Sequence, residues 1–90
     1  MKKKTVKLPN WLEVVVRTKR KVLFVGKAWA VSGVNELGPF DILPRHARFV
    51  GEIKERVVVH LEEGEKREWR REIGEGIIWV DGKGRVEVFC

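Results

Sequence analysis

Arg56-Val57-Val58-Val59-His60-Leu61 carries the clearest period in this 90-residue chain, and the period is that of a β-strand. Val57, Val59 and Leu61 share one phase, whereas Arg56 and His60 fall on the other. Successive side chains of a strand point to opposite faces of a sheet, so the pattern indicates one face in the core and one face in water. For His60, on the polar phase, a solvated side chain is expected rather than a ligand.

Six further segments are rich in Val, Ile, Phe and Trp, as is typical of strands. They are residues 12–17, 22–31, 49–53, 68–73, 77–80 and 85–89, and turn-forming residues separate them at 18–20, 33–39, 54–55, 63–64 and 81–84. The charge density of residues 62–72 would also suit a helix, but Gly64 and the alternation of Trp69, Arg71 and Ile73 favour a hairpin. The pattern predicts an all-β fold, a small two-sheet β-sandwich or flattened barrel of mostly antiparallel strands.

Length and charge predict one domain with a basic N-terminal tail. Ninety residues suit a single core, and 43% hydrophobic residues are too many for a disordered chain. Of the net charge of +6, four charges come from Lys2, Lys3, Lys4 and Lys7. We expect a tail at residues 1–10 and a domain at residues 11–90. No apolar run suits a membrane helix or a signal peptide, so the expected compartment is the cytoplasm.

The chain offers few residues for catalysis or metal binding. Cys90 is the only cysteine, so neither an internal disulfide nor a cysteine metal cluster can form. The two histidines, His46 and His60, stand without an evident nucleophile and base set. We therefore expect no enzyme, no metal and no cofactor.

Trp69 raises an alternative function. On a small β-barrel, an aromatic side chain among cations could stack the bases of single-stranded nucleic acid. The neighbouring cations are Arg67, Arg70 and Arg71. Glutamates interleave with them, so the local field is nearly neutral and a solvated face is favoured over nucleic-acid binding. Trp29 and Trp79 are instead expected in the core or at its rim, because a small core needs their large area.

Residues 38–47 hold two prolines and a Phe-Ile-Leu cluster within an expected connection. Pro39 and Pro44 fix φ and remove backbone donors, which indicates a rigid loop outside a central ladder. The segment resembles the signature Gly-x-x-Gly-Ile-Leu-Pro-x-His-Ala-Pro of the N-terminal β-sandwich domain of the epsilon subunit of F-type ATP synthases. Matching residues are Gly38, Ile42, Leu43, Pro44, His46 and Ala47, whereas Asp41 replaces the second Gly and Arg48 the final Pro.

The likeness to this family covers nearly the whole chain, with Glu55-Arg56 where the family often has Pro-Gly. It implies a two-sheet sandwich in the central stalk of a proton-translocating ATP synthase, a non-catalytic subunit present as a monomer in the complex. Its partners would be the gamma subunit and the c-ring, and no nucleic acid. The complex would hold it at the inner face of the cell membrane, with no transmembrane segment of its own. Because the chain stops at Cys90 without the family's helical hairpin, no inhibitory role is expected.

The resemblance also assigns roles to positions. The c-ring contact falls on Glu36, Leu37, Gly38 and Pro39, and the gamma contact falls on Thr18, His46 and Gly51. Phe40, Asp41, Ile42, Leu43, Pro44 and Ala47 form the structural part of the motif. Under this assignment, Glu36, His46 and the Gly38-Pro39 turn should be exposed at one end of the domain.

Overall fold

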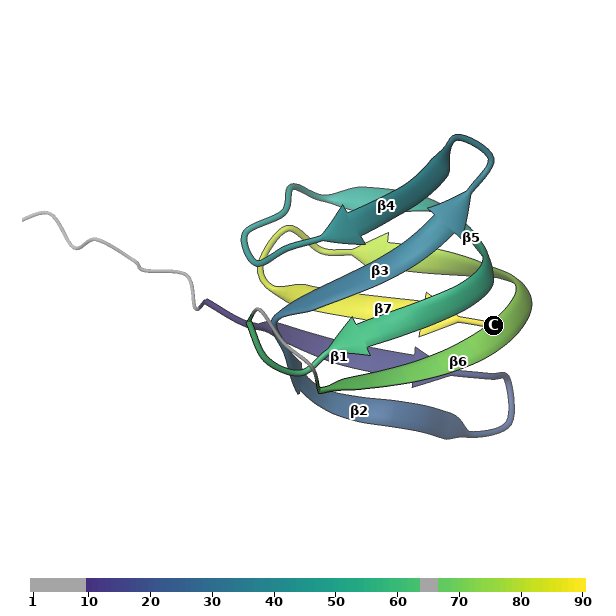
Figure 1. Cartoon of the computed structure of the whole chain (residues 1–90), viewed down its shortest axis with the longest axis horizontal. Coiled ribbons are helices and arrows are strands. Elements are labelled where there is room, and N and C mark those ends of the chain that lie inside the picture. The colour runs from purple at the N-terminus through teal and green to yellow at the C-terminus, as the bar shows by residue number, and fades with distance from the viewer. Residues whose placement is uncertain (1–9, 64–66) are drawn as a thin grey trace, which may run out of the picture.

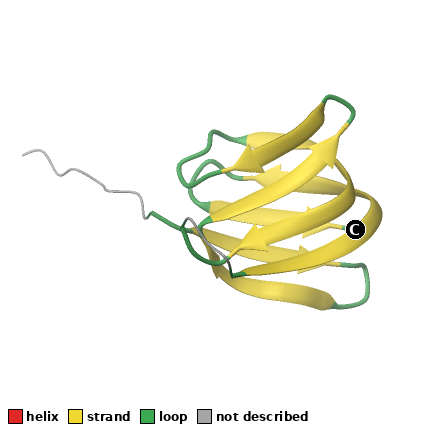
Figure 2. Cartoon of the chain, in the orientation of Figure 1, coloured by secondary structure: helices red, strands yellow, loops and turns green. Residues whose placement is uncertain are grey.

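A computed structural model describes residues 10–63 and 67–90, and within them every regular element is a strand (Figure 2). The strands are β1 (Leu12–Arg17), β2 (Val22–Ala28), β3 (Ala30–Asn35), β4 (Gly38–Ile42), β5 (Phe49–His60), β6 (Glu68–Val80) and β7 (Arg85–Phe89). The predicted all-β fold is confirmed. Residues 1–9 of the predicted tail lie outside the described residues. The described parts of the chain contain no helix that could span a membrane.

The seven strands form one sheet in the order β2-β1-β7-β6-β5-β3-β4. Neighbouring strands are antiparallel except β1 and β7, which run parallel. The two expected sheets are the halves of this single sheet, which folds over on itself through the long strands β5 and β6 (Figure 1). We call β2, β1 and β7, with residues 49–54 and 75–80, the β1 layer. The β3 layer comprises β3 and β4 with residues 56–60 and 68–72.

The sheet turns over at an irregularity that β5 and β6 share. Residue 55 of β5 and residues 73 and 74 of β6 have no partner in the ladder, and Glu55 has a φ of 70°, in the left-handed region. Between the two paired positions that flank the irregularity, β5 advances by two residues and β6 by three. The inward and outward alternation of side chains therefore continues along β5 but changes phase along β6. Trp69 and Ile78 therefore both face the core, although one number is odd and the other even.

The core lies between the two layers and is built almost wholly from aliphatic side chains. Its buried members are Leu12, Val14, Val16, Ala28, Val31, Ile42, Ile53, Val57, Val59, Ile78, Val80, Val86 and Val88. At the rim, the ring of Phe24 in β2 packs against Trp69 with 5.3 Å between centroids. This contact joins the edge of the β1 layer to the β3 layer. Trp29 is half-buried, but the prediction of a packed Trp79 is wrong, because the phase change turns Trp79 outward and leaves it 49% exposed.

Other element boundaries also differ from the prediction. Residues 22–31 form two strands, because the chain passes from the β1 layer to the β3 layer at Trp29, whose backbone N–H donates to the carbonyl of His60 at 2.7 Å. The expected connection at 38–47 begins as strand β4, and Pro39 is tolerated there because β4 is an edge strand. The segments predicted on either side of residues 54–55 merge into β5, and those at 68–73 and 77–80 merge into β6.

Candidate docking surface

The residues carried over to the c-ring contact form the tip of the β3–β4 hairpin: Glu36, Leu37, Gly38 and Pro39. The Leu37 side chain is 97% exposed, and its backbone N–H donates to Oδ1 of Asn35 at 2.8 Å. Gly38 has a φ of 115°, which a side chain would disfavour. Lys54 Nζ donates to Glu36 at 3.0 Å, and this hydrogen bond and the glutamate charge raise the pKa of Lys54. The tip is thus held at its base and presents Leu37 to solvent.

The second half of the motif, residues 43–48, forms the loop between β4 and β5. Its turn is closed by the backbone N–H of His46, which donates to the carbonyl of Leu43 at 3.1 Å, with Arg45 at a φ of 70°. Arg45 also donates to Oδ1 of Asn10 at 3.0 Å, which ties the loop to the start of β1. Ala47 O can only accept, so the contact of 2.7 Å places the proton of a neutral His46 on Nδ1.

The remaining motif residues serve the packing of this region. Ile42 is fully buried, and the ring of Phe40 lies 6.2 Å from that of Phe49 in an edge-to-face arrangement. The His46 ring meets the same Phe49 at 6.0 Å. Leu43 and Ala47 are exposed and Pro44 is half-buried. The loop is therefore a fixed structural piece whose histidine is engaged on both its backbone and its ring.

The expectation that Glu36, His46 and the Gly38-Pro39 turn lie at one end is wrong. Strand β4 starts in this turn, at Gly38, and its five residues carry the chain roughly 17 Å, at about 3.3 Å per residue, before the His46 loop begins. Thr18 is likewise apart from His46, because Thr18 follows β1 and the His46 loop is tied to Asn10 before β1. The hairpin tip and the Thr18 turn lie at one end of the molecule, and the His46 loop lies at the other (Figure 1).

Gly51, the third residue carried over to the gamma contact, faces inward. It pairs with the buried Ile78, and a Cβ at this position would meet the ring of Phe49 at 2.5 Å. The outward position next to it belongs to Val50, which is 64% exposed. Gly51 thus makes room for an aromatic ring in the core, and its neighbour is the residue available to a partner.

The outer side of the β1 layer carries a group of apolar side chains among charged ones, which is the feature that the sequence reasoning missed. We call the following set the apolar face: Val15, Val25, Val50, Ile77, Trp79 and Phe89. Val50 pairs with Trp79, Val15 pairs with Val25, and Ile77 pairs with Phe89. Val15 is half-buried and the others are exposed, with Val25 reaching 70%.

A signal for this face is present in the sequence. The segments Val14-Val15-Val16 and Ile77-Ile78-Trp79-Val80 are apolar on both phases of the strand period. A strand that is covered on one side alternates between apolar and polar residues, whereas a strand covered on both sides reads as a continuous apolar run. These runs therefore indicate that something covers the second side as well.

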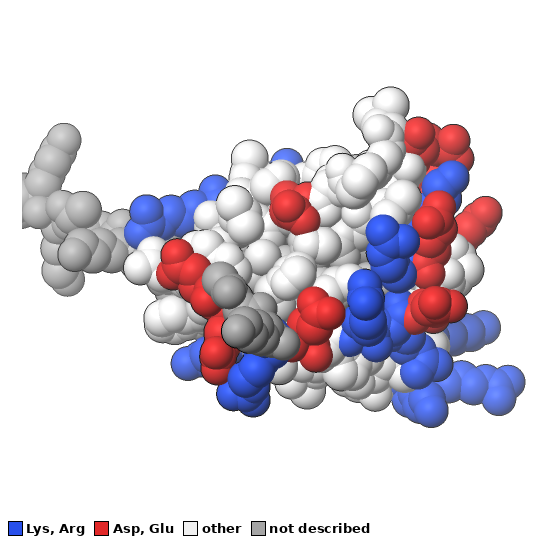
Figure 3. Space-filling model, viewed as in Figure 1, with Lys and Arg blue, Asp and Glu red and all other residues white. Residues whose placement is uncertain are grey.

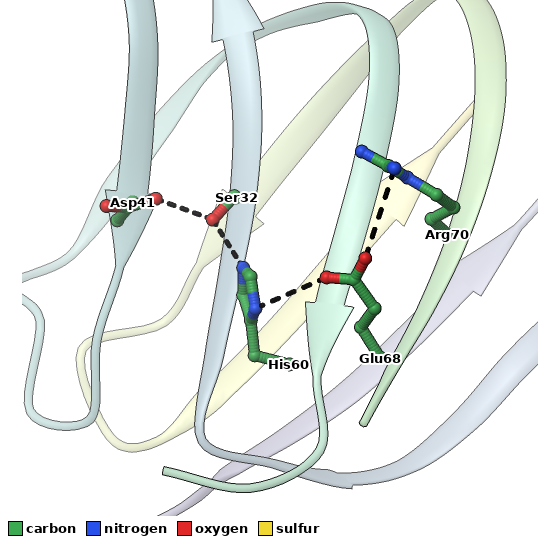
Figure 4. Close-up of polar contacts among 5 residues, drawn as sticks. All are labelled: Ser32, Asp41, His60, Glu68 and Arg70. Atoms are coloured by element: carbon green, nitrogen blue, oxygen red, sulfur yellow. Dashed lines mark hydrogen bonds and ion pairs between the residues drawn. The ribbon is translucent and has the colours of Figure 1, made fainter. Parts of the chain in front are cut away.

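The outer side of the β3 layer is polar by contrast (Figure 4). The Ser32 hydroxyl donates to Asp41 at 2.5 Å and lies 2.7 Å from Nε2 of His60. His60 Nδ1 is 3.8 Å from Glu68, which lies 3.9 Å from Arg70 on its other side. His60 lies on the polar side as expected, but its ring is held between two strands. Because the one Ser32 proton is directed to Asp41, the hydroxyl accepts from His60, which is the reverse of what a nucleophilic serine needs.

The arrangement expected for nucleic-acid stacking is not assembled around Trp69. Its indole is packed on Phe24 at the rim of the core and is only partly exposed. Arg67 pairs with Glu62 at 3.1 Å, and Arg70 with Glu68. Within residues 10–63 and 67–90 no group of three or more His, Cys, Asp or Glu side chains is arranged to hold a metal ion.

Comparison with known proteins places the fold. No family model and no curated protein sequence matches the chain. It superposes on a chain in the cryo-EM structure of the Euglena gracilis mitochondrial ATP synthase (OSCP, F1 and c-ring) with a TM-score of 0.83 and 16% identity, over 93% of this chain and 52% of that one. For the central stalk and c-ring of the Tetrahymena thermophila mitochondrial ATP synthase, the TM-score is 0.67 and the identity 11%, over 93% and 65%. The chain thus shares its fold with parts of ATP synthase structures and spans 52% and 65% of the chains it matches.

Proposed function

We propose that this chain is an epsilon-like, non-catalytic subunit in the central stalk of a proton-translocating F-type ATP synthase, where it joins the gamma subunit to the c-ring. The fold shared with chains of two ATP synthase structures supports the proposal, as does the motif at residues 38–47. The observation that carries it is the apolar face, because an exposed apolar patch on a sheet marks a surface for a protein partner.

The apolar face has the make-up of an interface centre. Interface centres are depleted in charge and enriched in aromatic residues, and a few such residues carry most of the binding energy. Trp79 pairs with Val50 on one side and with Glu87 on the other. Glu87 is bridged by Arg85 at 3.3 Å, so the carboxylate within the face already has a partner. Trp79 is therefore the residue on which docking should depend most.

The proposal gives the two partners different parts of the molecule. The gamma subunit would cover the apolar face, to which Gly51 contributes through its outward neighbour Val50. The c-ring would meet the hairpin tip, where Leu37 projects into solvent. Thr18 and His46, at opposite ends of the molecule, would contact gamma only at the margins of that surface. Through this complex the chain would lie peripheral to the membrane.

Co-purification tests the proposal. The untagged chain is expressed with a tagged gamma subunit from the same source and is washed at low and at high salt. A stoichiometric complex that survives high salt is expected, because salt screens exposed charges and leaves apolar contacts in place. Leu37→Ser is the control and should leave the complex with gamma intact. Leu37 lies on the hairpin tip, outside the apolar face, and its side chain touches little of its own domain. Recovery of gamma without the chain would refute the proposal.

A further inference from the structure

The turn between β1 and β2 carries a dense group of cations. We call this group the basic end: Arg17, Lys19, Arg20, Lys21 and Arg71. Arg71 comes from β6. Burial raises the pKa of the Cys90 thiol and the Arg71 charge acts against this, and the Cys90 N–H donates to the carbonyl of Arg17 at 2.9 Å. Within the described parts of the chain, none of the five forms an ion pair with a carboxylate. Their positive charge is therefore available to a partner.

The backbone holds this turn in one shape. Thr18 Oγ1 accepts from the backbone N–H groups of Arg20 at 3.1 Å and of Lys21 at 3.2 Å, and the Thr18 N–H donates to the carbonyl of Lys21 at 2.9 Å. Arg20 and Lys21 make these contacts only through their backbones, and the side chains of Lys19, Arg20 and Lys21 are exposed to solvent. A turn that is already ordered loses little entropy when a partner binds.

Exposed apolar side chains lie directly beside the cations. Arg17 pairs with Val22 of β2 on one side and with Phe89 of β7 on the other, and both are exposed. Cations next to exposed apolar side chains are what a protein presents to the headgroup region of an anionic bilayer. Proteins that hold single-stranded nucleic acid stack successive bases on several aromatic side chains. Here the pairings of Arg17 bring one aromatic ring, Phe89, beside the cations, and the ring of the neighbouring Trp69 is packed on Phe24.

Acidic residues lie on the other side of the same end. They are Glu36, Glu52, Glu55, Glu72 and Glu75, of which Glu36 pairs with Lys54 and Glu55 with Arg56. Figure 3 shows acidic side chains toward the upper right of the molecule and a cluster of basic ones toward the lower right. An anionic surface would therefore meet this end with the β1–β2 turn foremost and the hairpin tip raised away.

We propose that the basic end is a contact site for a membrane surface of anionic phospholipid, with Val22 at the level of the headgroups. The proposal is independent of the stalk assignment, because it rests only on charges and exposure in this chain. Near an anionic leaflet each Lys or Arg contributes about 1 kcal/mol, so removal of three should weaken partitioning roughly 100-fold.

The test measures flotation of the whole chain with vesicles of phosphatidylcholine alone or mixed with phosphatidylglycerol. The variant is the triple change Lys19→Gln, Arg20→Gln, Lys21→Gln, which keeps Thr18 and the backbone contacts. The matched control removes three cations from the opposite end, Arg48→Gln, Lys83→Gln, Arg85→Gln, and leaves the N-terminal lysines in place. A third variant, Lys19→Arg with Lys21→Arg, keeps the positive charges of the turn on different side chains.

We expect wild type and the arginine variant to float with the mixed vesicles and not with phosphatidylcholine. The basic-end variant should lose roughly 100-fold in partitioning, and the control less than about tenfold, since its cations lie farther from the surface. Equal losses in both variants would overturn the proposal, because net charge alone would then explain binding. Binding of single-stranded RNA, but not of vesicles, through the same three residues would also overturn it in favour of a nucleic-acid partner.

Discussion

Trp79→Ala is expected to weaken gamma binding about 60-fold while the domain stays folded. A tryptophan buries about 200 Å² when fully covered, and 49% exposure leaves about 100 Å² for a partner to cover. At about 25 cal/mol per Å² this area contributes about 2.5 kcal/mol of binding free energy, which corresponds to a loss of affinity of about 60-fold. The packed part of the ring lies on the surface of the sheet and leaves no cavity, so the loss of folding free energy should be at most about 2 kcal/mol.

Trp69→Ala is the matched control on the same strand. Its ring lies inside the layers against Phe24, so its removal should cost about 3 kcal/mol of folding free energy and leave gamma affinity within about twofold. Affinity is measured by titration calorimetry with purified gamma, and stability by urea unfolding followed by far-UV circular dichroism. The reasoning is refuted if Trp69→Ala weakens binding as much as Trp79→Ala does, or if Trp79→Ala changes affinity less than about threefold.

Three further changes test the fold itself, each by urea unfolding. Gly76→Ala should lower the free energy of unfolding by about 1–3 kcal/mol, because a Cβ there meets the carbonyl oxygen of Phe89. The control Gly74→Ala, with open space around it, should change the free energy of unfolding by less than about 0.5 kcal/mol. Equal effects of the two changes would contradict the packing. Glu55→Gly should stabilise by about 1 kcal/mol, since a left-handed φ is costly for a side chain, and a loss would show that the bend has another cause. Burial acts to raise the pKa of Asp81, but hydrogen bonds from two backbone N–H groups and nearby cations lower it overall from 3.8. The wild type should therefore lose stability as pH falls below that value, and Asp81→Asn should remove this part of the acid loss. A pH profile of stability that Asp81→Asn leaves unchanged would exclude the role.

Sequence reasoning succeeded where the inward positions of a strand keep one phase from end to end. The bounds of β1 and β7 were predicted correctly, because Val14 and Val16 in one and Val86 and Val88 in the other mark the inward phase. The all-β class followed from the same period. These elements depend only on local pattern, which a single sequence contains.

The errors about Trp69 and Trp79 share one cause, the turnover of the sheet at β5 and β6. The phase change of β6 exchanges the expected environments of Trp69 and Trp79, and it arises from two unpaired residues on one strand against one on the other. Nothing in the local pattern reports it: Glu55 adopts a left-handed φ without being glycine or asparagine. Pairing of distant strands decides which phase is inward, and that information is not local.

Predictions for the candidate site also succeeded where local residues decide the structure and failed where strand assignment does. The turn-forming residues at 33–39 predicted a turn, and the tip of the β3–β4 hairpin lies within that range. The placing of His46 with that tip failed because β4 was taken for a loop, which removed a strand length from between them. The apolar face was visible in the runs Val14–Val16 and Ile77–Val80, whose second apolar phase a one-sided sheet does not need.

Site-specific photocrosslinking in the complex tests the central claim most directly. A benzophenone amino acid replaces Val25 on the apolar face in one variant and Arg70 on the polar face of the β3 layer in the other; both positions are exposed and lie on strands. The account predicts a covalent adduct with the gamma subunit from position 25 and none from position 70. An adduct from position 70 alone, or none from position 25 in a complex that has formed, would contradict it.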